Sequence, residues 1–184
     1  IQRAELMKDA HQKQYPSARN ASVLITLFEE NGETYMVFIR RASTLRAHSG
    51  EIAFPGGAAE VSDVSPIMTA LREAYEEVGL TSSRVEVLGI MSPVFTVVSN
   101  FLITPIVAYL PQGPGILQLQ ESEVAEIIFL PLQGLANPAI YHTELWVRNN
   151  VPHTVSFFDY GAYRIWGATA HMLTMLLELL RDAY

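Results

Sequence analysis

The 184-residue chain contains no cysteine, only two lysines and no apolar run long enough to cross a membrane. The absence of cysteine excludes disulfides and thiolate chemistry. A net charge of −7 leaves no basic patch of the kind that binding to a nucleic-acid duplex requires. We therefore expect a cytoplasmic protein with neither a nucleic-acid nor a membrane partner. A phosphorylated substrate would draw its counter-charge from metal ions and a few arginines.

The length and the 49% share of hydrophobic residues predict one domain with a sizeable core. We expect this single domain over residues 1–184, with a helical extension over 1–20 whose helix covers 3–14. Because the chain begins with Ile1 rather than Met, we expect its start to have been trimmed. The last predicted helix, 168–182, is apolar around much of its circumference, which favours burial on two sides or a homo-oligomer.

Strand-like and helix-like segments alternate along the chain, which predicts an α/β fold with a sheet layered between helices. Segments 21–29 and 34–41 flank Asn31-Gly32, a strong hairpin signal. The remaining predicted strands are 51–54, 84–91, 101–110, 126–130, 139–147 and 154–160, and the remaining predicted helices are 66–78 and 131–136.

The most informative motif follows a Pro-Gly-Gly turn and places Glu73, Glu76 and Glu77 at i, i+3 and i+4. On a helix these three carboxylates fall within an arc of about 100°, opposite an apolar side. Ser65 can cap the start of this helix, and Gly79 suits its C-terminal cap. Like charges at this spacing repel, so we expect a divalent cation to offset them.

The same segment resembles the Nudix box of the Nudix hydrolases. Gly57 is followed by five residues, Asp63, eight residues, and then Arg72-Glu-Ala-Tyr-Glu-Glu-Val-Gly-Leu. The box has a glutamate where this chain has Asp63, and seven residues rather than eight before the arginine. A glutamate pair on a helix is ordinarily a solvated face, but the joint pattern favours function. The resemblance implies an α/β/α sandwich around a mixed sheet and a metal-dependent pyrophosphatase.

The resemblance also implies a role for each residue of the motif. Glu76 and Glu77 match the glutamates that bind metal in this family. Glu73 matches a metal ligand or a group that helps to activate water. Gly56 resembles the glycine whose backbone carbonyl joins the metal shell, and Arg72 is expected to orient the carboxylates by a salt bridge. The implied cofactor is Mg²⁺ or Mn²⁺, and both prefer oxygen ligands of this kind.

A second pattern lies just upstream and is typical of the coenzyme A pyrophosphatase branch of the family. It runs from Arg41 through Arg46 to the Phe-Pro-Gly-Gly sequence that ends at Gly57. This pattern usually opens with Leu-Leu-Thr, where residues 37–39 are Val-Phe-Ile. The longer spacer of the box also matches this branch. The resemblance implies that coenzyme A or a derivative is hydrolysed to 3′,5′-ADP and 4′-phosphopantetheine.

A cationic stretch precedes the turn and predicts contacts with substrate phosphates. Arg41 and Arg46 are the candidates, because arginine binds phosphate oxygens bidentately. His48 is balanced between a phosphate contact and loop packing, and Arg40 is interpreted as a solvated loop residue. Gly57, in the glycine-rich turn, is expected to lie against the substrate.

One further carboxylate is expected from a loop outside the helix. Glu123 is predicted to begin a strand and to serve as a metal ligand or a general base, with a plain surface acid as the alternative. Glu121 and Glu126 are nearby candidates for the same role.

Two other functions remain open at this point. One is a different Nudix pyrophosphatase acting on ADP-ribose, NADH or nucleoside triphosphates, which the upstream pattern disfavours. The other is a non-catalytic nucleotide-sensing domain, which the presence of all three helix carboxylates disfavours.

Overall fold

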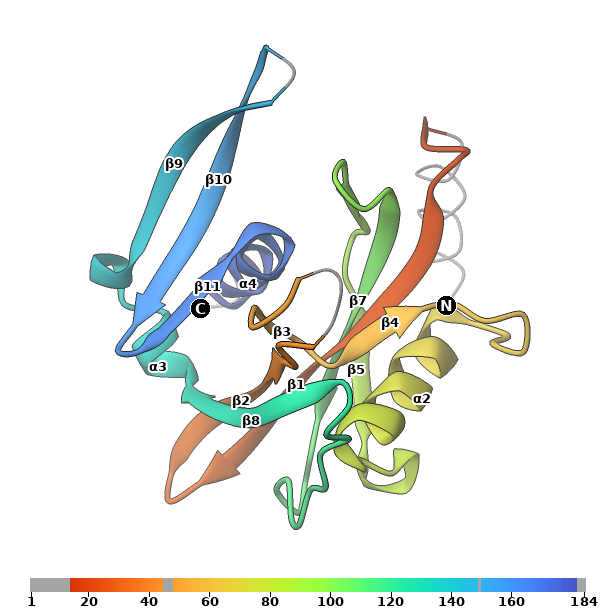
Figure 1. Cartoon of the computed structure of the whole chain (residues 1–184). Coiled ribbons are helices and arrows are strands. Elements are labelled where there is room, and N and C mark those ends of the chain that lie inside the picture. Colours follow the sequence, from red (N-terminus) through yellow and green to blue (C-terminus); the bar gives the residue numbers. More distant parts are fainter. Residues whose placement is uncertain (1–13, 45–47, 149, 182–184) are drawn as a thin grey trace.

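The computed structural model describes residues 14–44, 48–148 and 150–181. Within these ranges an eight-stranded sheet lies between two helices, α2 (Pro66–Val78) and α4 (Gly167–Arg181), on opposite sides of it (Figure 1). The predicted α/β fold is therefore confirmed. The helix predicted over 3–14 falls outside the described residues apart from its last position. None of the described helices has the length and apolar character needed to cross a membrane.

The main sheet is mixed. Its strands are β1 (Arg19–Glu30), β2 (Glu33–Arg41), β3 (Ile52–Ala53), β4 (Gly56–Ala58), β5 (Glu86–Ile90), β6 (Val94–Thr96), β7 (Phe101–Tyr109) and β8 (Val124–Pro131). The central order is β3-β2-β1-β7-β5, with β4 beside β1, β6 beside β7 and β8 beside β2. The central pair, β1 and β7, is parallel, and the other pairs are antiparallel.

A second, three-stranded sheet follows the main one in the chain. It consists of β9 (Tyr141–Arg148), β10 (Val151–Tyr160) and β11 (Tyr163–Trp166), and its β9–β10 hairpin extends away from the main sheet (Figure 1). The sequence predicted the first two of these strands but not β11. Short helical segments join the elements. They are Ser82–Arg84, α3 (Leu132–Leu135) and Pro138–Ile140.

Local signals explain the β1–β2 hairpin and the layers around it. Asn31 and Gly32 have φ angles of 53° and 79°, as a tight two-residue hairpin turn requires. Side chains alternate along β1, so Leu24 packs in the cluster under α2. Its neighbour Ile25 packs in the cluster that contains the apolar face of α4. The sheet therefore carries a core on each of its two faces.

Helix α2 is held at both ends, and this fixes the carboxylates that it carries. The Ser65 hydroxyl accepts a hydrogen bond from the Met68 amide at 3.2 Å, and a proline occupies the first turn. Gly79 ends the helix with a φ of 70°, the left-handed cap that the sequence predicted. Ala74 and Val78 are buried against the sheet. The helix therefore presents a defined rotation to the strands beside it.

Candidate active site

Glu77 lies at the centre of the site and is only 2% exposed. The sequence placed it on a polar helix face, but the glycine-rich turn packs over that face and covers it. Its Oε2 accepts a hydrogen bond from the Gly56 amide at 2.9 Å, and its Oε1 lies 3.9 Å from Nη1 of Arg41. Burial raises the pKa of Glu77 to about 8, because these two contacts offset only part of the desolvation.

Two glycines allow the turn to approach the helix so closely. A Cβ atom at Gly57 would lie 2.5 Å from Cδ of Glu73, and one at Gly56 would overlap the backbone of Ser22 and Val23. Glu73 is itself mostly buried, and burial raises its pKa, partly offset by its hydrogen bond from Arg72. The Gly-Gly pair is therefore required by contact with the carboxylates and with β1.

Arg72 joins the remaining acidic groups. It binds Asp63 with two hydrogen bonds, of 3.1 Å from Nε and 2.9 Å from Nη2. Its Nη1 donates to Glu73 at 2.9 Å and to Glu76 at 3.0 Å, and its Nη2 also donates to the carbonyl of Ala58. The arginine holds the pKa of Asp63 down at about 2. The extra residue in the spacer is thus absorbed by the loop, and Asp63 still reaches the arginine.

Comparison with known proteins decides the family. The family model for the NUDIX domain matches residues 18–147. The chain is 39% identical over 160 residues to the uncharacterized Nudix hydrolase NudL of Photorhabdus laumondii, a match that covers 87% of this chain and 84% of that protein. The chain belongs to the Nudix hydrolase family. It is accordingly a Nudix pyrophosphatase, from a family that acts on small nucleotide substrates and generally uses divalent metal ions.

Two further matches extend over nearly the whole chain. The NudL protein of Enterobacter sp. (strain 638) is 34% identical over 176 residues, covering 96% of this chain and 90% of that protein. The crystal structure of a MutT/nudix family protein from Enterococcus faecalis has a TM-score of 0.56 at 15% identity, covering 97% of this chain and 68% of that one. The structural match supports the Nudix fold and nothing beyond it.

The donor atoms of this Nudix hydrolase suit a hard divalent cation. Carboxylate oxygens of Glu73, Glu76 and Glu77 and the carbonyl of Gly56 belong to one turn and one helix face. Glu77 is buried with too little counter-charge, the condition that a bound cation would relieve. In the described ranges no three His, Asp or Glu side chains yet enclose a metal site, and two of these glutamates bond to Arg72 instead.

Glu123 lies close enough to influence the helix carboxylates electrostatically. Its charge contributes to the raised pKa of both Glu73 and Glu77. The strand β8 begins at Val124, two residues before the predicted strand 126–130 and one residue after Glu123, which was also expected to begin a strand. Glu123 is therefore an exposed residue just before β8. Its carbonyl accepts the Ala42 amide at 2.8 Å, which ties it to the end of β2.

The predicted phosphate-binding residues have different surroundings. Arg41 ends β2 beside Glu77, and its Nε is buried without a hydrogen-bond partner among the residues that the structure describes. His48 has a φ of 57°, and its Nδ1 lies 2.9 Å from Oε2 of Glu51. Arg46 lies outside the described residues. Of the predicted phosphate-binding side chains that the structure describes, Arg41 is therefore the one that lies beside a helix carboxylate.

The interpretation of Arg40 as a solvated loop residue is wrong. Arg40 belongs to β2, and its Nε donates to Glu126 at 2.9 Å. The hydroxyl of Tyr163 donates to the other oxygen of Glu126 at 3.0 Å. The sequence reasoning missed this group, because Tyr163 lies on a strand that it did not predict. Glu126 is thereby committed to a structural ion pair.

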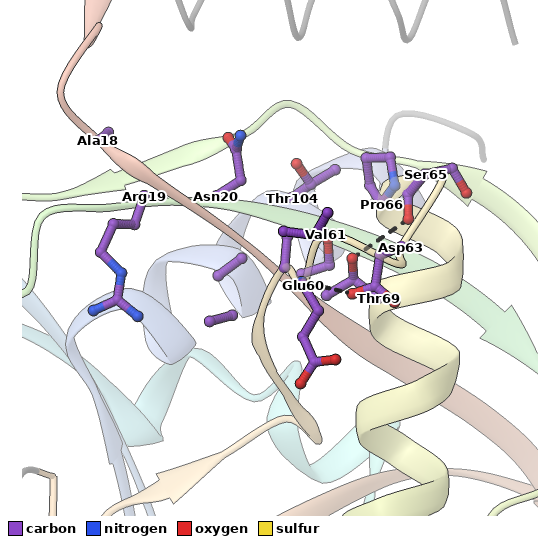
Figure 2. A pocket seen from close by; sticks show the side chains of 14 residues that line it. Ala18, Arg19, Asn20, Glu60, Val61, Asp63, Ser65, Pro66, Thr69 and Thr104 are labelled. Atoms are coloured by element: carbon purple, nitrogen blue, oxygen red, sulfur yellow. Dashed lines mark hydrogen bonds between the residues drawn. The ribbon is translucent and has the colours of Figure 1, made fainter.

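A cavity of about 470 Å³ opens beside the loop that leads into α2 (Figure 2). It is lined by the first residues of β1, by Thr104 of β7, by Thr69 and by most of the residues from 58 to 66. Figure 2 shows Ser65, Thr69 and Asp63 gathered at the start of the helix. None of the three helix carboxylates is among its lining residues. Asp63, which also binds Arg72, is the link between this cavity and the carboxylate site.

Proposed function

We propose that this Nudix hydrolase cleaves the pyrophosphate bond of coenzyme A, or of an acyl or oxidised derivative, giving 3′,5′-ADP and 4′-phosphopantetheine. One observation carries the proposal. The pattern typical of the coenzyme A branch begins at Arg41 and ends in the Gly-Gly turn, and its two ends meet on the same carboxylate. Arg41 and the Gly56 amide approach the two oxygens of Glu77, at 3.9 and 2.9 Å.

The carboxylates of α2 supply the site for Mg²⁺ or Mn²⁺ in this proposal. Glu73, Glu76 and Glu77, with the carbonyl of Gly56, would hold the ion. The bound ion neutralises phosphate charge and lowers the pKa of a water molecule. Arg72 keeps Glu73 and Glu76 within reach of each other through its bonds to both.

Arg41 and Arg46 would bind different phosphate groups of the substrate. Arg41 lies beside Glu77, so it would contact the pyrophosphate that the metal site engages. Arg46, five residues further along, would bind the 3′-phosphate that distinguishes coenzyme A from its dephospho form. His48 is a further candidate for a phosphate contact. Glu123 would act as the general base or as an additional metal ligand.

A substrate panel tests the proposal directly. Coenzyme A, ADP-ribose, NADH and nucleoside triphosphates are each incubated with the enzyme and Mg²⁺ or Mn²⁺, and the products are identified by mass. We expect the highest kcat/KM for coenzyme A, with 3′,5′-ADP among the products. A higher kcat/KM for another nucleotide would assign the enzyme to a different Nudix pyrophosphatase, and no hydrolysis at all would favour a sensing domain.

A further inference from the structure

Strand β9 is an edge strand that lacks the bulges, prolines and glycines that often protect an edge. It lies at the end of the sheet β11-β10-β9, and no described strand pairs with its outer side. Its register with β10 runs through eight consecutive pairs without a bulge. The strand contains neither proline nor glycine. Edges of this length are normally shortened, bulged, charged or covered, because their free N–H and C=O groups can pair with another chain.

The same strand exposes apolar side chains. Leu145 is 69% exposed, Trp146 44% and Val147 68%, and Val151 of β10 is 51% exposed. The face that carries Leu145 and Val147 has no charged residue on either strand of the hairpin. Its other members are Tyr141, Thr143, Pro152, Thr154, Ser156 and Phe158. An apolar edge on a chain of net charge −7 is a candidate interface.

We propose that β9 pairs with β9 of a second copy of the chain, antiparallel, about a two-fold axis at Trp146. The sequence of the strand is self-complementary in this register. Leu145 stands opposite Val147 of the second copy, and the position of Glu144 is opposite that of Arg148. The contact is isologous, so each of these pairs occurs twice. The two three-stranded sheets join into one of six strands.

Charge selects this register over its neighbours. Two-fold antiparallel pairing keeps each side chain on its face, so alternative registers shift by whole pairs. Centring on Leu145 sets Glu144 against Trp146, and centring on Val147 sets Trp146 against Arg148. The register at Trp146 sets Glu144 opposite the backbone position of Arg148, and residues of unlike charge are favourable partners across strands. A second copy fits the edge better than a lipid surface, because Glu144, which accepts a hydrogen bond from Nε1 of Trp146 at 2.8 Å, is a charged group that lipid would desolvate.

Cysteine cross-linking tests the register, because the chain has no cysteine of its own. In Trp146→Cys the two Cβ atoms on the axis would be about 4.5–5.5 Å apart, close enough for a disulfide after small adjustments. The matched control is Thr143→Cys, at another exposed position of β9. Its two copies would lie about 20 Å apart, from six residues at roughly 3.3 Å each. We expect mild oxidation to cross-link Trp146→Cys and not Thr143→Cys.

Sedimentation of the full chain provides an independent measurement. We expect the wild type to sediment as a dimer and Leu145→Lys to shift to half that mass. Ile116→Lys, the same kind of change at a loop residue that is 88% exposed, should remain dimeric. Glu144→Arg should raise the dimer dissociation constant, and adding Arg148→Glu should lower it again. If Trp146→Cys does not fold, the comparison of Leu145→Lys with Ile116→Lys still tests whether β9 forms the dimer interface.

Three results would overturn the proposal. The first is a wild type that stays monomeric at every concentration. The second is equal cross-linking at positions 143 and 146. The third is a dimer that Leu145→Lys leaves intact. A monomer that floats with phosphatidylcholine vesicles would assign the edge to a lipid surface instead.

Discussion

At the scale of single residues, Glu77 meets conflicting demands. Packing of the glycine-rich turn buries its carboxylate, while the proposed chemistry needs it ionised. Its pKa of about 8 in the folded protein compares with 4.5 for an ordinary glutamate. The folded state therefore retains a proton that the unfolded state releases between these values. The stability that this group provides is fully present below pH 4.5 and is lost as pH rises through 8.

This difference predicts a pH dependence in metal-free protein. In EDTA, the free energy of unfolding of the wild type should fall from pH 4.5 to pH 8 more steeply than that of Glu77→Gln. Glu178→Gln, at an exposed site on α4, should keep the wild-type slope. Adding Mg²⁺ at pH 8 should stabilise the wild type and not Glu77→Gln, because ligands stabilise the state that binds them. The free energy of unfolding is measured by urea denaturation at each pH. An equal dependence on pH in the wild type and Glu77→Gln would contradict the raised pKa of Glu77.

Replacing Arg41 and replacing Arg46 should have different effects on coenzyme A and on its dephospho form. A charge-assisted hydrogen bond contributes about 1.5–3 kcal/mol, so Arg46→Ala should lower kcat/KM for coenzyme A by roughly tenfold to a hundredfold. Dephospho-coenzyme A, which lacks the 3′-phosphate, should be unaffected. Arg41→Ala should impair both substrates, because Arg41 lies beside Glu77. If Arg46→Ala lowered kcat/KM equally for both substrates, Arg46 would not be the residue that binds the 3′-phosphate.

Glu123 is testable as the general base. If it deprotonates the attacking water, Glu123→Gln should lower kcat while leaving Mn²⁺ affinity unchanged in calorimetry. Raising the pH should partly restore the rate, because hydroxide replaces the missing base. Glu121→Gln is the matched control at a nearby exposed position. A loss of Mn²⁺ affinity equal to the loss of rate would identify Glu123 as a ligand, and a wild-type rate would leave it a surface acid.

At the scale of elements, the site depends on the contact between strand β4 and helix α2. Gly57→Ala would place a methyl group against Glu73. We expect kcat/KM to fall by about a hundredfold, as small displacements of reacting groups do, in a protein that still folds. Gly89→Ala is the control, since a Cβ on that β5 residue meets nothing within 4 Å. Comparable activity in the two variants would show that this contact is dispensable.

Local sequence signals predicted the elements whose causes are local. Asn31-Gly32 specifies the hairpin of β1 and β2, and Ser65 with Gly79 delimits α2. The strands β4, β6 and β11 were missed, because each is only three or four residues long, and β4 also pairs with a strand, β1, that is distant in sequence. Short segments of this kind carry no detectable periodicity.

At the scale of the whole molecule, the roles of the site residues stay a prediction, and the sequence correctly predicted the sheet between helices. It did not predict the burial of Glu77, because that depends on how strand β4 lies across the helix. The pairing of Arg40 with Glu126 was missed for a related reason, since β2 and β8 are 83 residues or more apart in sequence along their register. Packing between distant segments decides both features.

The central claim is that the α2 carboxylates drive metal-dependent hydrolysis of coenzyme A. The most direct measurement is kcat for coenzyme A with Mg²⁺, with products identified by mass, in wild type, Glu76→Gln, Glu77→Gln and the control Glu178→Gln. Metal-borne charge stabilisation is worth several kcal/mol, so we predict losses of at least about a hundredfold in the first two variants and none in the control. Wild-type turnover in Glu76→Gln and Glu77→Gln, or products other than 3′,5′-ADP and 4′-phosphopantetheine, would contradict the account.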